Sequence, residues 1–390
     1  MARWYGSREE RRAVKLWSLP EAVDDALWRL ESDLRQGRAR EDSVQRVVSL
    51  IAGLPPQKLV AVGQHVRDAL VAVPPAPVEF LQRWLGGAEG EMGLLRATPG
   101  LEYLFLFHRD GHLRQAALDK IDQAPPGVFW IAAIAYRQND WAPAVRAAAR
   151  RCVVRVATHV GPEGLADAAY FLLARVPTWG RWRLEPHVHP ENLFLVRPEM
   201  ADALAHRIGR AVAGPAGSIL RQALRQPYLD GHLPALAVGA VQPIVRMVAL
   251  HTLIEGQAAW PEGWSREMIN KPFNIYRPVR LYATRPVVCP ATKTCYLEQA
   301  ARDRSVVVRR LAAATLAQAL GREGAAWEEW EPVLARLERD SDRAIRDRIA
   351  FIRRYRAQGR DPLVPFLEAL TNGEDFDPGR DVDRGHEVEL

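Results

Sequence analysis

Apolar residues recur every three or four positions over most of this 390-residue chain, in runs that end at Pro or Gly. This spacing places the apolar side chains on one face of a helix, so each run predicts an amphipathic helix. Near the N-terminus the runs predict helices over about 18–34, 42–52, 57–73 and 80–85. Regular helix pairs are expected from 100 to 176. The pattern therefore predicts an all-α fold.

The helical pattern is lost twice along the chain. Residues 177–197 and 256–296 lack a helical period and are rich in aromatic residues, Arg and Pro. Helices are expected between these stretches and after them, as far as about residue 370. Loops this long in a compact architecture are usually functional or disordered, and the aromatic content argues against disorder. We therefore expect two long non-helical insertions.

A short motif centred on arginine recurs in the helical parts. An apolar residue precedes the arginine in most copies, and in most copies Ala follows three positions later, so that a neighbouring helix can approach closely. The copies are centred on Arg114, Arg146, Arg246, Arg309 and Arg346, with a weaker one on Arg280. Their separations correspond to one, three, two and one units of a helix-pair repeat.

An aspartate stands six residues before the arginine in three of these copies. It is expected in the turn between two helices, where its carboxylate accepts backbone N–H bonds and complements the helix dipole. Arg is expected to reach back to an Asp of the adjacent repeat, and loss of a buried pair is expected to cost about 1 to 3 kcal/mol. This predicted structural ladder comprises Asp140, Arg146, Arg246, Asp303, Arg309, Asp340 and Arg346.

The pattern Asp-x-x-Pro-x-Val-Arg-x-x-Ala resembles the HEAT repeat family of α-solenoids. The resemblance is good over residues 108–156 and 300–352, partial over 236–255, and absent as a motif in the first 100 residues. It implies a right-handed α-solenoid of stacked helix pairs over 101–370, interrupted by the two insertions, with residues 1–100 as a divergent helical N-terminal cap. HEAT-type proteins are mostly scaffolds and binding surfaces, and a few are enzymes, including DNA glycosylases of HEAT-like fold.

Cysteine content and charge indicate the cellular compartment and the kinds of partner to expect. Three cysteines without tight pairing indicate reduced thiols, and neither a signal peptide nor a membrane-length apolar run is present, so a cytoplasmic protein without a membrane partner is expected. The net charge of +6 combines an acidic tail, residues 371–390, expected to be disordered, with a basic body. That body could attract nucleic acid or an acidic protein, or the charge could simply cover solvated helix faces.

Motifs of common enzymes are missing from the chain. It has no phosphate-binding loop, dinucleotide fingerprint, serine elbow or zinc-protease helix, so we expect no cofactor and favour a protein that is not an enzyme. His187 and His189 are weak metal candidates, because the further ligands of a metal site are not identified. His108 and His112 flank Gly111 and are expected to be turn residues.

The insertions interleave aromatic rings with cations. Three roles are open for such a surface. It can bind nucleic acid by stacking on bases and attracting phosphates, it can bind a protein as a hot spot, or its aromatic side chains can pack the insertion against the helices. The candidate partner-binding residues are Trp179, Arg181, Trp182, Arg183, Trp264, Lys271, Tyr276, Arg277, Arg280 and Arg285.

We favour a non-enzymatic scaffold that grips a macromolecule, preferably a protein, through its concave face and these insertions, as an adaptor, a toxin inhibitor or a defence component would. The alternative is a protein that binds DNA or RNA, including a HEAT-like DNA glycosylase. The oligomeric state is left open by the sequence.

Overall fold

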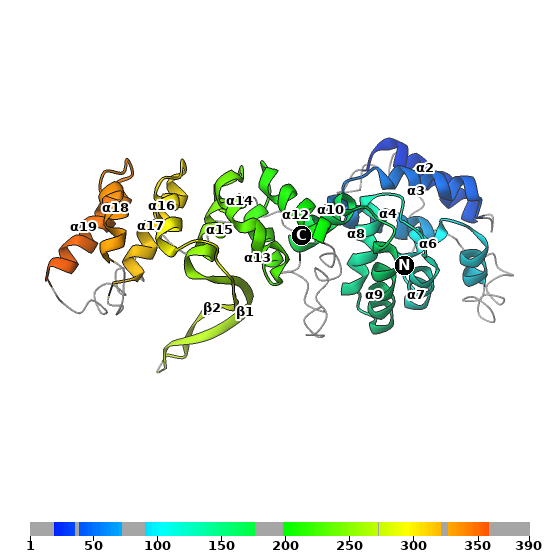
Figure 1. Ribbon diagram of the computed structural model, residues 1–390. Coiled ribbons are helices and arrows are strands. Elements are labelled where there is room, and N and C mark those ends of the chain that lie inside the picture. The colour runs from blue at the N-terminus through cyan, green and yellow to red at the C-terminus, as the bar shows by residue number, and fades with distance from the viewer. Residues whose placement is uncertain are drawn as a thin grey trace. The chain divides into compact units, whose positions relative to one another are not determined.

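The computed structural model describes residues 19–35, 39–71, 90–175, 198–271, 273–320 and 327–358, and these residues are mostly helical (Figure 1). The chain divides after Met200 into two compact units. The expected insertion at 177–197 and the expected acidic tail at 371–390 lie outside the described residues.

Unit 1 consists of short helices whose bounds follow the apolar pattern. Residues 90–97 are also helical. The labelled elements are α2 (Glu21–Arg35), α3 (Glu41–Ala52), η1 (Pro56–Lys58), α4 (Leu59–Val71), α6 (Leu101–Phe105), α7 (Gly111–Lys120), α8 (Val128–Tyr136), η2 (Arg137–Asn139), α9 (Pro143–Ala157) and α10 (Pro162–Leu173).

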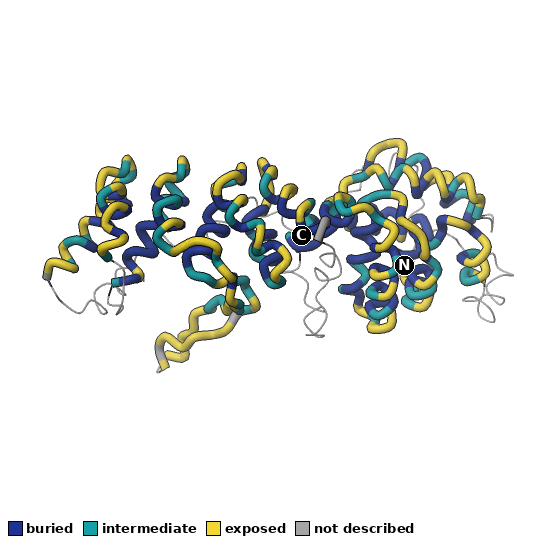
Figure 2. The backbone as a smooth tube through the Cα atoms, viewed as in Figure 1, coloured by how far each residue is buried: buried dark blue, intermediate teal, exposed yellow. Residues whose placement is uncertain are grey.

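Helix α8 is the centre of unit 1. Its residues 129–135 are all buried, as Figure 2 shows in dark blue, because the helix is apolar on every side and must be covered on every side. It packs against α3, α4, α9 and α10. The indole Nε1 of Trp130 donates a hydrogen bond to the backbone oxygen of Val48 at 3.0 Å. Helices α3 and α4 therefore share a core with the helices that follow residue 100.

Unit 2 is a succession of helix pairs (Figure 1). Along its C-terminal half each helix packs on the next helix and on the next but one, so that α15 contacts α16 and α17, and α17 contacts α18 and α19. The elements are α12 (Pro198–Arg210), α13 (Ala216–Ala223), η5 (Pro227–His232), α14 (Leu233–Gly239), α15 (Pro243–Glu255), α16 (Lys293–Ala301), α17 (Val306–Gln318), α18 (Trp327–Leu337) and α19 (Arg343–Gln358).

The described residues are mostly helical, as the all-α prediction expects, and the second insertion, expected to be non-helical, is a β-hairpin. Strand β1 (Gln257–Asn270) pairs antiparallel with β2 (Ile275–Pro286). The insertion is also shorter than expected, because α16 already begins at Lys293. The weak repeat copy centred on Arg280 lies in β2 and is not part of a helix pair. Its Ile, Tyr, Val, Leu and Thr residues favour the extended backbone.

Arginine–aspartate pairs link successive repeats. The guanidinium of Arg114 donates two hydrogen bonds to the carboxylate of Asp140, from Nε at 2.9 Å and from Nη2 at 2.8 Å. Arg246 forms the same pair of bonds with Asp303 at 2.7 and 2.8 Å, and Arg309 forms it with Asp340 at 2.7 and 3.0 Å. Each arginine thus reaches forward to the next repeat, whereas the sequence suggested that it reaches back.

The remaining guanidinium nitrogen has an equally regular role. Nη1 of Arg114, Arg146, Arg246, Arg309 and Arg346 donates to the backbone oxygens six and five residues earlier. Arg146 therefore binds the carbonyl of Asp140, not its carboxylate. In each copy Nη1 thus links the helix to the turn that precedes it. Where the bidentate pair exists, Nε and Nη2 bind the aspartate of the next repeat.

The ladder aspartates also shape the turn in which they lie. Oδ1 of Asp140, Asp303 and Asp340 accepts the backbone N–H two residues later, at 3.0, 2.7 and 2.8 Å. His108 occupies this position in the first repeat, and its Nδ1 accepts the N–H of Asp110 at 3.0 Å. Burial lowers the pKa of His108 and outweighs the opposing effect of Glu91. The neutral imidazole can therefore accept this bond as the carboxylates do.

Replacing Asp140 with Ala removes a carboxylate that Arg114 and Arg137 share, and the Arg114 and Asp140 side chains are only 4% and 2% exposed. We expect the free energy of unfolding to fall by about 3 to 5 kcal/mol, more than the sequence alone indicated, because buried guanidinium charge is left uncompensated. Denaturant unfolding measures this change. Asp119→Ala is the control: its partner Arg151 is 57% exposed, so a loss below about 1 kcal/mol is expected. Equal losses in the two variants would contradict the assignment.

Acid is expected to weaken the ladder. Burial on its own raises the pKa of Asp303, but the hydrogen bonds from Arg246 and Ser305 outweigh it and hold the pKa below its usual value. The bond from Arg309 does the same for Asp340. A carboxyl with a lowered folded pKa stabilises the fold fully above its unfolded pKa, near 3.8, and this stabilisation is lost as pH falls toward the folded pKa. The unfolding free energy should therefore decrease below about pH 5, and less steeply in Asp303→Asn, as denaturant titrations at several pH values will show.

Candidate partner-binding hairpin

The hairpin of unit 2 is a long ribbon with two irregularities. Its register pairs Gln257 with Pro286 at the base and Asn270 with Ile275 at the turn, and it shifts twice, at Glu262 and at Ile269. Each shift is a bulge that inserts one unpaired residue into β1 and changes which side the following side chains face. The side-chain arrangement therefore follows from the register and not from simple alternation along β1.

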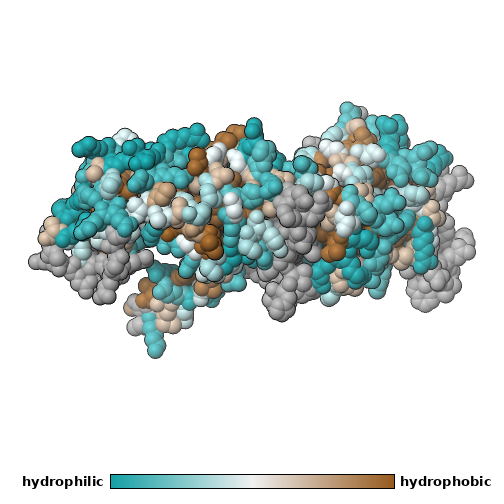
Figure 3. Space-filling view, viewed as in Figure 1, coloured by the Kyte–Doolittle hydropathy of each residue, from teal (hydrophilic) through white to brown (hydrophobic). Residues whose placement is uncertain are grey.

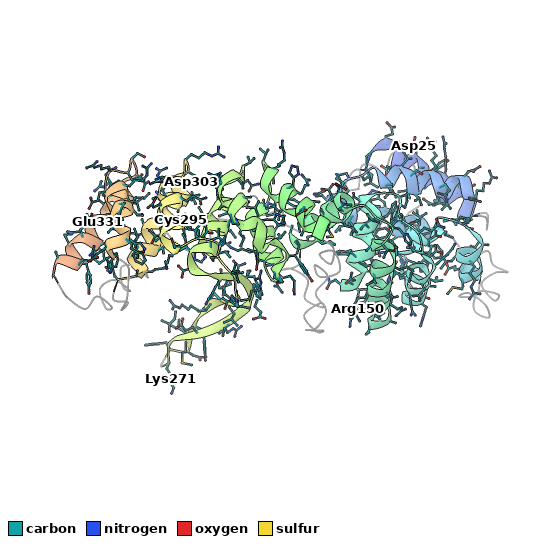
Figure 4. The ribbon with its side chains drawn as sticks, viewed as in Figure 1. Asp25, Arg150, Lys271, Cys295, Asp303 and Glu331 are labelled. Carbon is teal, nitrogen blue, oxygen red and sulfur yellow. The ribbon has the colours of Figure 1, made fainter. Side chains whose placement is uncertain are left out.

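The turn at the far end is tight. The N–H of Asn274 donates to the backbone oxygen of Lys271 at 3.2 Å, and Asn274 adopts a φ of 52°. Asparagine tolerates this left-handed conformation better than most residues. Lys271 is exposed and lies at the tip of the hairpin (Figure 4).

Arg285 anchors the base of the hairpin to the helices. Its guanidinium donates to both carboxylate oxygens of Asp230, at 2.8 and 2.5 Å, and to the backbone oxygens of Leu224 and Gln226. Arg225 lies over the ring of Trp260 at 5.9 Å from its centroid. An isolated two-stranded hairpin is only marginally stable in water, so these contacts are needed to hold it. The structure thus gives Arg285 an internal contact at the base of the hairpin, and its predicted contact with a partner stays a prediction.

The two faces of the ribbon differ in chemistry. Because paired residues share a side and successive residues alternate, one side carries Arg266, Met268, Tyr276, Arg280 and Tyr282, which we name the aromatic face. The opposite side, which we name the apolar face, carries Ile275, Val279 and Leu281 together with the exposed ion pair of Arg277 and Glu267. In that pair Nε of Arg277 donates to Glu267 at 2.7 Å, so the apolar face is locally neutral.

Exposed apolar side chains concentrate on this hairpin. Among the described residues, seven of the sixteen large hydrophobic side chains with high exposure belong to it. Ile269 is 61% exposed, Phe273 75%, Ile275 49% and Leu281 48%. Figures 2 and 3 show a ribbon that stands away from the helices of its unit, with hydrophobic surface upon it. Exposed apolar clusters of this kind mark contact sites for other molecules.

The structure places the predicted site residues in three groups. On the hairpin, Lys271 lies near the tip, Tyr276 and Arg280 lie on the aromatic face, Arg277 lies on the opposite face and Arg285 lies at the base. Trp264 pairs with Arg280 in the register, but its side chain is outside the described part. The candidates that fall in residues 177–197, also outside it, are Trp179, Arg181, Trp182, Arg183, His187 and His189.

The anchor residues Arg225 and Asp230 were not anticipated from sequence. They belong to the helical part before the hairpin, 36 and 55 residues from their partners Pro261 and Arg285, and no local motif connects them. A signal for the strands themselves was present. Half of the residues over 275–284 are β-branched or aromatic, which is typical of a strand, and Pro278 among them indicates an edge strand.

Neither a metal centre nor a membrane span is found in the described part of the chain. No group of three or more His, Cys, Asp and Glu side chains there is arranged to hold a metal ion. No described helix is both long and apolar enough to cross a bilayer.

Comparison with protein-family models, with curated protein sequences and with solved structures finds no match to this chain.

Loss of the anchor should release the hairpin. In Arg285→Gln the bonds to Asp230 lose their charge, and bonds to charged groups contribute about 1.5 to 3 kcal/mol. We expect amide hydrogen exchange over 257–286 to accelerate by about tenfold to a hundredfold. Arg277→Gln, which breaks the exposed pair with Glu267, is the control and should leave exchange at the base unchanged. Equal protection in the wild type and in Arg285→Gln would argue against the anchor.

Proposed function

We propose that this protein is a non-enzymatic scaffold that binds a macromolecular partner and presents the β-hairpin to it. Of the possible partners, we favour a protein. Its helix pairs would stack as a right-handed HEAT-like solenoid, and the concave face of that solenoid would supply further contact area. The recurring arginine–aspartate pairs support the repeat arrangement. The exposed apolar side chains of the hairpin are the observation on which the binding role rests.

The apolar face suits a protein surface. Ile275 and Leu281 are each about half exposed, and the only charges on this part of the face, Arg277 and Glu267, neutralise each other. The centre of a protein interface is apolar and depleted of net charge, and a few buried side chains supply most of the binding free energy. A partner with a complementary apolar surface could cover this face without leaving a charge uncompensated.

Contact through side chains is favoured over addition of a further strand. Pro261 in β1 and Pro278 in β2 lack the N–H group that an added strand would use, and the bulges at Glu262 and Ile269 twist the edge of β1. Prolines and bulges at edges are devices that prevent edge-to-edge pairing. The partner should therefore recognise the faces and the tip of the hairpin.

Affinity purification from native lysate tests the proposal. The full-length chain, treated with nuclease, is expected to retain one protein in stoichiometric amount on a denaturing gel, with a low ratio of absorbance at 260 nm to that at 280 nm. The double variant Ile275→Ser, Leu281→Ser should lose this protein, because hot-spot side chains each contribute more than about 1 kcal/mol.

The matched control is Val212→Ser, Val238→Ser, which changes two exposed side chains of unit 2 outside the hairpin. It should retain the partner. The same bound protein in the hairpin variant and in the wild type would exclude the hairpin as the contact. Absence of any stoichiometric protein from all three samples would argue against a protein scaffold.

A further inference from the structure

We propose that the aromatic face of the hairpin is a second binding site, and that it takes single-stranded nucleic acid. This site goes beyond the protein contact proposed for the opposite face. It would make the hairpin a two-sided adapter that holds a protein on one side and a nucleic acid strand on the other.

Charge is distributed unequally between the two faces. Residues 257–286 contain five basic and two acidic side chains. Of the two acids, Glu267 lies on the apolar face, bonded to Arg277, and Glu262 lies in a bulge. The aromatic face carries Arg266 and Arg280 and no carboxylate in its paired positions. A phosphate backbone on this face would meet positive charge without a repelling acid in the same row.

Two rings on this face are available for stacking. Tyr276 and Tyr282 are each 42% exposed and lie on the same side of β2, six residues apart. At about 3.3 Å per residue they are separated by about 20 Å along the strand. Arg280 lies between them on the same strand, and Arg266 is on the neighbouring strand of the same face. Alternating aromatic and cationic groups along one surface are the arrangement that binds bases by stacking and phosphates by charge.

The same arrangement favours a single strand over a duplex. In a duplex the faces of the bases are covered by their neighbours, whereas an unpaired strand can turn its bases onto a protein ring. On this side Gln257, Arg266, Met268, Pro278 and Thr284 are exposed, whereas Ala259, Pro261 and Arg280 are half-buried. At the base of the hairpin, Arg225 and Asp230 contact Trp260 and Arg285, which lie on the side of the apolar face. No such contact with a side chain is found at the base of the aromatic face among the described residues.

Fluorescence anisotropy with the full-length chain tests the site. The probes are fluorescein-labelled oligo(dT) and oligo(U) of about 20 nucleotides and a DNA duplex of the same length. We expect the single strands to bind more tightly than the duplex. Tyr276→Leu, Tyr282→Leu should weaken single-strand binding at least about tenfold, since each stacked base contributes substantially to affinity. Arg266→Gln should reduce the slope of log K against log salt by about 0.7.

Two matched variants distinguish the loss of stacking from a general disturbance of the hairpin. Tyr276→Phe, Tyr282→Phe retains the rings and should bind as the wild type does. Ile275→Ser, Leu281→Ser changes the apolar face and should also bind nucleic acid normally, although it is expected to lose the protein partner. Tighter binding of the duplex, equal affinities of the Leu and Phe variants, or the absence of single-strand binding at low salt would each overturn the proposal. Loss of the protein partner in the Leu variant, with nucleic acid binding unaffected, would assign the aromatic face to the protein contact instead.

Discussion

The bidentate contact between an arginine and the aspartate of the next repeat is the interaction on which the helical architecture depends. Each such arginine is bonded on all sides: two nitrogens hold the carboxylate across the repeat junction, and the third holds the carbonyls of its own preceding turn. The carboxylate in turn accepts the backbone N–H that opens the following helix. One residue pair therefore fixes a turn, a helix start and the junction between two helix pairs. Burying these charges is tolerable only because nearly every donor has an acceptor.

The last pair of the ladder is more exposed than the first, although burial does not fall steadily, since Arg246 is only 1% and Asp303 9% exposed. The side chains of Arg114 and Asp140 are 4% and 2% exposed, whereas those of Arg309 and Asp340 are 16% and 6% exposed. The strength of an ion pair rises as water is excluded, and so does the penalty for breaking it. The same motif thus contributes differently at different junctions, and the repeats are not energetically equivalent even where their sequences agree.

The sequence pattern picks out the recurring arginines and aspartates but not the connections between them. Each arginine was expected to reach back to an aspartate of the adjacent repeat, yet Asp140 receives Arg114, which lies 26 residues earlier. A one-dimensional pattern shows which residues recur, while the choice between two equivalent partners depends on how the helices pack in three dimensions. His108 illustrates the same limit, because its role as a substitute for the ladder aspartate follows from burial and one hydrogen bond. The hairpin faces could not be predicted, since two bulges change the alternation of β1 at Glu262 and Ile269.

The hairpin also enters and leaves the helical framework at one place. Gly256 ends α15 in a left-handed conformation, with a φ of 65°, and its carbonyl accepts the N–H of Val287 at 2.9 Å, so that the two ends of the ribbon meet. Arg246 and Asp303 bridge the segment that contains it, 57 residues apart in sequence. Because the cost of closing a loop grows only slowly with its length, the helices on either side tolerate a long insertion between these points. The hairpin is therefore an insertion whose two ends meet at one place in the helical framework, and any other insertion at this place would have to replace the contact of Arg285 with Asp230.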